Sequence, residues 1–200
     1  MKKKICLVFR VVALSVLVGC VPAEAVDGAE PATVTSALTN LLVNGSFTTS
    51  MSGWTETVTG GDGHGGSGWD SSGYANGGGL LTSIAPGCQS QDYCVGNYQN
   101  YWAQQVQLTA GSSHTLSFAY RSEHGVYSFS DLSVVLTKPP YGIPVTLFSN
   151  SGTGGAWQTQ SVDISSHLTT TGSYGVRLVS DLGNDLGFYA EGRFDEVALY

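Results

Sequence analysis

The chain has 200 residues, room for one domain of ordinary size, and only 12% of them are charged, with 27 glycines and 6 prolines, which argues against a helix-rich fold. After the first ten residues, four basic side chains stand against fifteen acidic ones, a formal net charge of −11. A basic stripe that could displace counterions from phosphates is missing, so a nucleic-acid partner and electrostatic docking on anionic lipid are both excluded.

The N-terminus has the pattern of an export signal. Lysines at positions 2–4 precede an apolar stretch, 5–19, that is too short for a good membrane span. Two cleavage sites compete. The sequence Leu-Val-Gly-Cys ending at Cys20 resembles the bacterial lipobox, which would make residues 1–19 the signal peptide and Cys20 the lipidated first residue, whereas cleavage after Ala25 fits ordinary signal peptidase. We therefore predict export, with a lipid anchor at the outer membrane or cell surface as the only membrane contact, or secretion if the second site is used.

A flexible tether is predicted over residues 20–38, which are rich in Ala, Thr, Pro and Glu and show no apolar periodicity. The folded domain is predicted to span residues 39–200. It contains two cysteines, Cys88 and Cys94, and two thiols this close usually form a disulfide in an oxidising compartment. The alternative, a metal site, needs further ligands, and the nearest histidines are badly spaced for zinc. We predict the disulfide.

Short alternating or β-branched runs, separated by Gly, Ser, Asn and Pro, continue to the C-terminus. Each run predicts a strand, and the runs are residues 41–43, 54–59, 80–84, 102–108, 114–121, 132–137, 145–148, 157–164, 174–180 and 193–200. Since about ten strands are expected and a helical pattern is not found, the predicted fold class is all-β, an antiparallel sandwich or barrel.

Alternation along the runs assigns side chains to faces. We predict a buried set, Val106, Leu108, Leu116, Phe118 and Tyr120, and an outward set, Gln105, Gln107, Ser117, Ala119 and Arg121. Trp54 and Trp157 are predicted to lie in the core, while Trp102 is left undecided because its parity agrees with inward Val106. A half-buried sheet of this kind leaves a polar outer face for ligands.

The segment from Gly60 to Gly79 differs from the rest, with ten glycines in twenty residues. This composition cannot build a core, so the whole segment is predicted to be a loop. Residues 65–70 match the opening of the calcium-binding nonapeptide repeat, but a single unstacked copy cannot form that site.

The order of several landmarks resembles the galactose-binding-domain-like jelly rolls, which include many bacterial carbohydrate-binding modules. The landmarks are Asn44-Gly-Ser-Phe47, Ser52-Gly-Trp54, Gln104-x-Val106-x-Leu108-x-Ala110-Gly111 leading into residues 114–121, Trp157, Val176-Arg-Leu178 and Phe194-Asp-Glu-Val-Ala-Leu199. The resemblance covers residues 39–200. It implies a jelly-roll β-sandwich of two antiparallel sheets, usually non-catalytic, that binds glycans on a concave face or at loop tips.

Many members of that group also hold a structural calcium between the first strand and an acid in the last strand. Asp195 is at the matching C-terminal position, but Thr48 replaces the acid that often follows Asn-Gly-x-Phe. The resemblance therefore implies calcium as the one cofactor, bound through backbone carbonyls and Asp195.

Sugar recognition needs flat apolar rings that stack on the C–H faces of a sugar and planar polar groups that bond its hydroxyls. Aromatic residues of the glycine-rich segment and of the region around the cysteines, with two polar residues of the outer sheet face, meet this need: Trp69, Tyr74, Tyr93, Tyr98, Tyr101, Gln105 and Arg121. The alternatives are that these rings pin long loops onto the sandwich and that the polar pair is ordinary solvated surface.

Recognised catalytic motifs are missing from the sequence. Asp195 and Glu196 would point to opposite faces of a regular strand, so they cannot flank one glycosidic bond without a bulge. Asp181, Asn184 and Asp185 are placed in a glycine-containing turn that could ligate a cation or simply form the turn. We predict a non-catalytic carbohydrate-binding protein. The alternative is a structural or adhesive extracellular protein whose jelly roll contacts a surface protein or a second copy.

Overall fold

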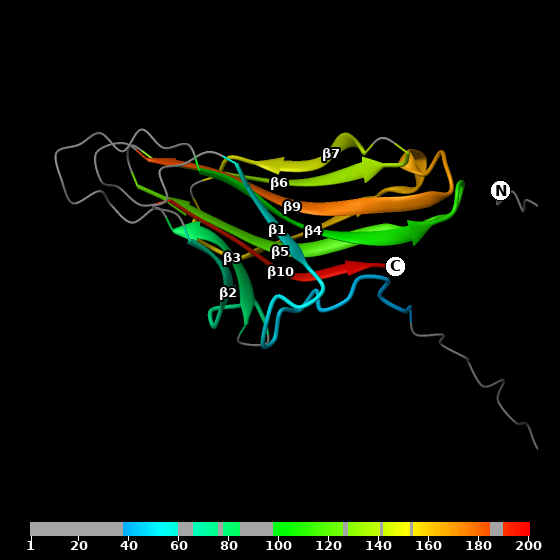
Figure 1. The fold of residues 1–200 in the computed structure, drawn as a ribbon. Helices are drawn as coiled ribbons and strands as arrows, with labels where there is room; N and C mark the ends of the chain where they lie inside the picture. Colours follow the sequence, from blue (N-terminus) through cyan, green and yellow to red (C-terminus); the bar gives the residue numbers. More distant parts are fainter. Residues whose placement is uncertain are drawn as a thin grey trace, which may run out of the picture. The chain divides into compact units, whose positions relative to one another are not determined.

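The structure is a computed structural model, which describes residues 38–59, 66–75, 78–84, 98–125, 128–140, 142–152, 154–184 and 190–200. The described residues fold into two five-stranded antiparallel sheets packed face to face, which confirms the predicted all-β sandwich (Figure 1). Within the described residues no helix is long and apolar enough to cross a membrane.

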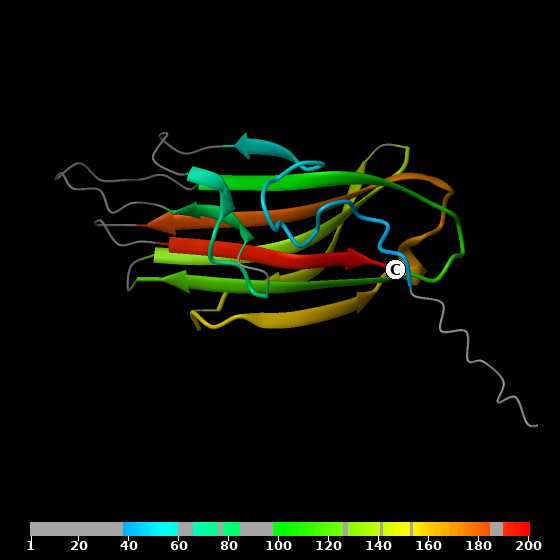
Figure 2. The same cartoon turned by 90° about the horizontal axis from the view of Figure 1, so that it is seen from below.

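Sheet A has the strand order β1-β4-β9-β6-β7. Its strands are β1 (Thr55–Thr59), β4 (Tyr98–Leu108), β9 (Gly172–Asn184), β6 (Ser128–Lys138) and β7 (Ile143–Asn150). Sheet B has the order β2-β3-β10-β5-β8, with β2 (Gly66–Asp70), β3 (Gly79–Ile84), β10 (Ala190–Leu199), β5 (Thr115–His124) and β8 (Gln158–Asp163). One 3-10 turn, η1 (Ser165–His167), follows β8. Figure 2 shows β10 alongside β5 in sheet B.

The core lies between the sheets and is filled by the alternating apolar residues of both. The predicted inward set, Val106, Leu108, Leu116, Phe118 and Tyr120, is buried as expected, and β6 and β9 add Leu132, Val134, Leu136, Tyr174, Val176 and Leu178. Burying one side chain of this size contributes roughly 1.5–3 kcal/mol. The side chains at the alternate positions face outward, where they can contact a ligand.

The three strand-associated tryptophans differ in burial. Trp54 is buried as predicted, and Trp102, left open by the sequence, is also buried and donates its indole N–H to Ser67 Oγ at 3.2 Å. The core prediction for Trp157 is wrong, because this residue is half-buried and packs against Tyr74 on the outer side of sheet B. It shares the outward parity of Thr159, which the register places opposite Ala119.

Three other sequence expectations need correction. The glycine-rich segment is not all loop, because Gly66–Asp70 forms β2 and pairs with β3. Glycine has the same backbone N–H and C=O groups as other residues, so it can take part in this pairing. Residues 41–43 are bends and not a strand. Asp181 lies within β9 and not in a turn, since that strand continues to Asn184.

A β-bulge interrupts β10, with a register shift between Asp195 and Ala198 and a φ of 49° at Glu196. The argument that Asp195 and Glu196 point to opposite faces assumed a regular strand and does not apply here. Asp195 is nevertheless fully buried, so a substrate bond cannot reach its carboxylate in this structure.

Candidate functional site

The predicted ligand residues do not form one cluster but divide between the two outer faces. Tyr101 and Gln105 lie on the outer face of sheet A, and Tyr74 and Arg121 lie on that of sheet B. Trp69 and Tyr98, expected in loops, belong to strands β2 and β4. Tyr93, Cys20, Cys88 and Cys94 lie outside the described residues, so the structure does not bear on the predicted disulfide and lipidation.

A hollow of about 660 Å³ opens at the β1 edge of sheet A and is called the β4 hollow below. Its walls come from β1, β4, β9 and the chain that leads into β1, and its lining residues are Val43, Gly53, Thr55, Thr57, Tyr101, Ala103, Gln104, Gln105 and Arg177. The hollow combines one aromatic ring, one guanidinium, two amides and two threonine hydroxyls.

Tyr101 and Arg177 form the centre of the β4 hollow. Arg177 is opposite Ala103 in the β4–β9 register, one diagonal position away from Tyr101, and its Cζ atom lies 4.6 Å from the centroid of the Tyr101 ring. A guanidinium over an aromatic ring is held by attraction to the negative face of the ring, and its N–H groups can still form hydrogen bonds. The pair therefore presents donors beside an apolar surface.

Gln105 extends across β9 because its partner in the register is Gly175, which has no side chain. The amide nitrogen of Gln105 and the Thr137 hydroxyl both lie over this glycine, within 3.0 Å and 2.4 Å of where a Cβ would be. Gln105 Oε1 accepts a hydrogen bond from Ser173 Oγ at 3.0 Å, which fixes the amide plane. The planar Gln105 amide thus occupies the space over Gly175 of β9, where there is no side chain.

The wall opposite β9 is fixed by the buried side chain of Gln104. Its Nε2 donates to Val43 O at 2.9 Å and Gly53 O at 3.1 Å, and its Oε1 accepts the Val43 N–H at 2.6 Å. Trp54 Nε1 donates to the same Val43 carbonyl at 3.1 Å. These bonds fix this side of the hollow, because the Gln104 side chain that makes them is buried.

Farther along the outer face of sheet A the charge becomes negative. Asp131 and Asp181 are direct cross-strand partners on β6 and β9, and Gln99 Nε2 donates to Asp181 Oδ2 at 3.2 Å. Arg177 is the one charged residue in the lining of the β4 hollow. The electrostatics of this face do not suit a polyanion.

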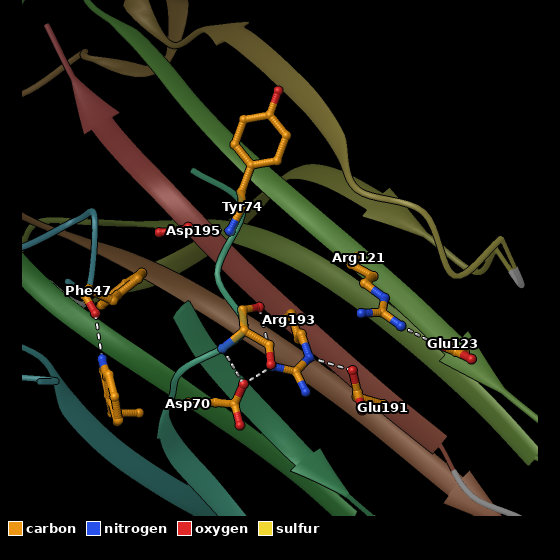
Figure 3. A network of polar contacts seen from close by, with 10 residues as sticks. Phe47, Asp70, Tyr74, Arg121, Glu123, Glu191, Arg193 and Asp195 are labelled. Carbon is orange, nitrogen blue, oxygen red and sulfur yellow. Dashed lines mark hydrogen bonds and ion pairs between the residues drawn. The ribbon is translucent and has the colours of Figure 1, made fainter. Parts of the chain in front are cut away.

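The outer face of sheet B is organised differently, because the segment of residues 70–75 crosses it. Asp70 pairs with Arg193 and also accepts the Ser72 N–H at 2.7 Å, while Glu191 pairs with the other side of the Arg193 guanidinium (Figure 3). Burial acts to raise the pKa of Asp70, but the hydrogen bonds from Arg193 and Ser72 outweigh it and leave the pKa below its usual value. Arg193 is thereby clamped between two carboxylates.

Asp195 holds the same segment from beneath. Its Oδ2 accepts the Tyr74 N–H at 2.6 Å and its Oδ1 accepts the Glu196 N–H at 2.8 Å. Burial raises the pKa of this carboxyl although the backbone N–H groups favour its charged form. Within the described residues three or more His, Cys, Asp or Glu side chains do not gather to hold a metal. Each carboxylate oxygen of Asp195 accepts one backbone N–H, and calcium stays a prediction.

Trp69 has a structural contact of its own. Its indole N–H donates to Phe47 O at 2.6 Å, and 44% of the residue is exposed. For this tryptophan the bond supports the alternative that the ring pins a loop onto the sandwich.

Arg177 was not among the predicted ligand residues, and Trp157 was predicted to lie in the core. The signal for Arg177 was its position between Val176 and Leu178, because one polar residue between two inward apolar ones must face outward. The signal for Trp157 was weaker, since nothing local indicates that Tyr74 reaches it from about eighty residues earlier in the chain.

No protein-family model matches the sequence, and no curated protein matches it significantly. Solved structures do match in fold. TmCBM61, a carbohydrate-binding module in complex with β-1,4-galactotriose, has a TM-score of 0.53 and 17% identity over 82% of this chain and 99% of that chain. The K1 cleaved adhesin domain of Lys-gingipain from Porphyromonas gingivalis has a TM-score of 0.55 and 18% identity over 78% and 95%.

An arabinose-bound α-L-arabinofuranosidase also matches, with a TM-score of 0.54 and 13% identity over 80% of this chain but only 26% of that one. The similar chains thus include a binding module, an adhesin domain and part of an enzyme. At these identities the likeness concerns the fold. It confirms that this chain has the jelly-roll β-sandwich fold found in carbohydrate-binding modules.

Proposed function

We propose that the protein binds a neutral glycan chain in the β4 hollow without chemical turnover. The observation that carries this proposal is the meeting of the Tyr101–Arg177 stack and the fixed Gln105 amide in one hollow of about 660 Å³. The fold that it shares with TmCBM61, solved with β-1,4-galactotriose, supports the same class of ligand.

The chemistry of the hollow suits a sugar. The Tyr101 ring offers an apolar surface for the C–H face of a pyranose, and Arg177 and Gln105 offer planar donors and acceptors for its hydroxyls. Thr55 and Thr57 add hydroxyls along β1. A neutral glycan fits best. Asp131 and Asp181 lie on the same face, and the protein has a strongly negative net charge, so carboxylated or sulfated glycans would be repelled.

A binding role without turnover is supported by the burial of Asp195, which keeps its carboxylate away from a substrate bond. Part of a glycosidase has the same fold, so each polysaccharide that the protein binds should also be assayed for reducing-end release. We expect no release above the rate seen without protein.

The proposal is tested by affinity electrophoresis in gels that contain a neutral polysaccharide, with galactan, arabinan, xylan, mannan and mixed-linkage glucan tried in turn. Tyr101→Ala should weaken retention by at least about tenfold, the equivalent of about 1.4 kcal/mol, with little change in melting temperature. Gln107→Ala is the matched control, since Gln107 is exposed on the same face of β4 but outside the hollow. Equal retention of the two variants would contradict the proposal.

Export, a lipid at Cys20 and a disulfide between Cys88 and Cys94 belong to the same proposal, because a glycan binder of this kind acts outside the cytoplasm. Metabolic labelling with a fatty acid should mark the wild type and not Cys20→Ser. Thiol titration of the unfolded protein should find neither Cys88 nor Cys94 free. If calcium is bound, adding a chelator should lower the melting temperature of the protein. A melting temperature that the chelator leaves unchanged would contradict a calcium site.

The second candidate function is adhesion or assembly through protein contacts, and the likeness to a gingipain adhesin domain favours it. Sedimentation velocity without added sugar separates the two. A scaffold subunit would associate with itself or with a surface protein in that experiment, whereas a glycan binder stays monomeric.

A further inference from the structure

A second aromatic surface lies on the outer face of sheet B, away from the β4 hollow. The rings of Tyr74 and Trp157 have centroids 5.8 Å apart and planes inclined by 59°. Although the two rings pack together, 47% of Tyr74 remains exposed. This pair differs from rings that serve only packing, such as Phe47, which contacts Trp54 and is fully buried.

The pair is held on a fixed base. The Tyr74 N–H donates to the fully buried carboxylate of Asp195, and the Asp70–Arg193 ion pair holds the segment a few residues earlier (Figure 3). Trp157 immediately precedes β8, where Gln158 is opposite Tyr120 and accepts its phenol O–H at 2.8 Å. The positions of both rings are thus set by strands of sheet B.

Polar groups lie next to the rings. The last register pair of β5 and β8 joins Tyr120 and Gln158, so Arg121 and Trp157 are the next residues beyond that pair, and Arg121 pairs through Nη2 with Glu123. The Arg121 Nε atom is buried and lacks a hydrogen-bond partner among the described residues. The Arg121 side chain as a whole is 27% exposed, so the accessible part of its guanidinium can donate to a sugar hydroxyl.

We infer that Tyr74, Trp157 and Arg121 form a second glycan-binding site. This surface has the same elements as the β4 hollow, a ring surface and a planar guanidinium, and the paired Arg121 and Glu123 give it no net charge, which suits a neutral sugar. Because the two sites lie on the outer faces of opposite sheets, one domain would hold two glycan chains at once and link them. The inference rests on the proposed function for the class of ligand.

The test uses the same five polysaccharides in two measurements. The first is gel retention of the wild type, Tyr101→Ala, the double variant Tyr74→Ala/Trp157→Ala and the combination of all three substitutions. The second is turbidity on mixing protein with the soluble polysaccharide, which rises only if one molecule links two chains. Tyr74→Ala keeps the backbone bond to Asp195, and Trp157→Ala alone serves as a second variant if the double variant melts early. Tyr200→Ala, at an exposed tyrosine outside both sites, is the control.

We expect Tyr101→Ala and the double variant each to retain weakened binding and to lose turbidity, and the combination to lose retention. A double variant that is retained and forms turbidity like the wild type overturns the second site. If Tyr101→Ala alone abolishes retention, the inference is also overturned while the proposed function stands. If only the double variant loses retention, the proposed site in the β4 hollow is wrong. A wild type that none of the five polysaccharides retains overturns both.

Discussion

The outer faces of the two sheets use their polar residues in opposite ways. On sheet A, Gln105 and Arg177 converge on open space, and each is fixed by one neighbour, Ser173 or Tyr101. On sheet B, Arg193 and Asp195 are buried and fully engaged in holding the segment of residues 70–75. Polar groups that bind each other stabilise a fold, and polar groups fixed beside a hollow are available to a ligand. The difference predicts that substitutions in the buried network around Arg193 and Asp195 change stability, while those in the β4 hollow change binding.

The largest effect on stability is expected from Gly73→Ala. A methyl group there would lie 1.7 Å from Gly78 O and 2.8 Å from Asp195 Oδ2, and the backbone carbonyl cannot move aside. We expect a loss of about 3 kcal/mol in the free energy of unfolding, measured by urea denaturation. Gly154→Ala, whose added methyl would meet only Gln158 Nε2 at 3.9 Å, is the control. Similar urea midpoints for the two variants would show that Gly73 does not approach Gly78 and Asp195 this closely.

Asp70→Asn should cost about 1 kcal/mol near neutral pH, because it removes the charge that pairs with Arg193. The folded pKa of Asp70 is lowered, so its stabilisation is complete above the unfolded pKa of about 3.9 and is lost as the pH falls through the lower folded value. The stability difference between wild type and Asp70→Asn should therefore be constant from about pH 5 to 7 and shrink below about pH 4. A difference that grows on acidification would contradict the ion pair.

Gly175→Ala should cost less stability than Gly73→Ala, about 1–2 kcal/mol, because the added methyl meets the ends of two side chains and not backbone, Thr137 Oγ1 at 2.4 Å and Gln105 Nε2 at 3.0 Å. Its effect on binding should be the larger one, since Gln105 must leave its place over β9. Thermal melting and gel retention of the same preparation compare the two effects. If Gly175→Ala lowers the melting temperature but is retained in the gel like the wild type, Gln105 does not contact the glycan.

The smallest change is expected from Ser180→Ala on the inner side of β9. Ser180 is fully buried, and its hydroxyl lacks a partner among the described residues. Removing a buried hydroxyl that makes no bond should leave stability unchanged or raise it slightly, by less than about 1 kcal/mol in urea denaturation. A clear loss of stability would mean that a buried water or an undescribed residue bonds to this hydroxyl.

How much the sequence could predict depended on whether the information was local. The alternation from residue 114 to 121 predicted which side chains enter the core, and only Ala119 departs, being outward in parity but buried where the segment of residues 70–75 crosses the sheet. Strand β2 was missed because its glycines carry no alternating pattern. Its pairing with β3 is made by backbone hydrogen bonds, which leave no pattern in the sequence. The Tyr74–Trp157 contact and the Tyr101–Arg177 stack join residues distant in sequence, so only the strand order could reveal them.

The central claim, that a glycan binds in the β4 hollow, is tested most directly by amide chemical-shift mapping of ¹⁵N-labelled domain titrated with an oligosaccharide of the polysaccharide that retains it. The account predicts the largest shift changes at residues 101–105 of β4 and 175–177 of β9, with smaller ones at Thr55 and Thr57. Changes at residues 74 and 157 would accompany them if the second site is also filled. Shift changes that leave β4 and β9 unaffected would contradict the claim.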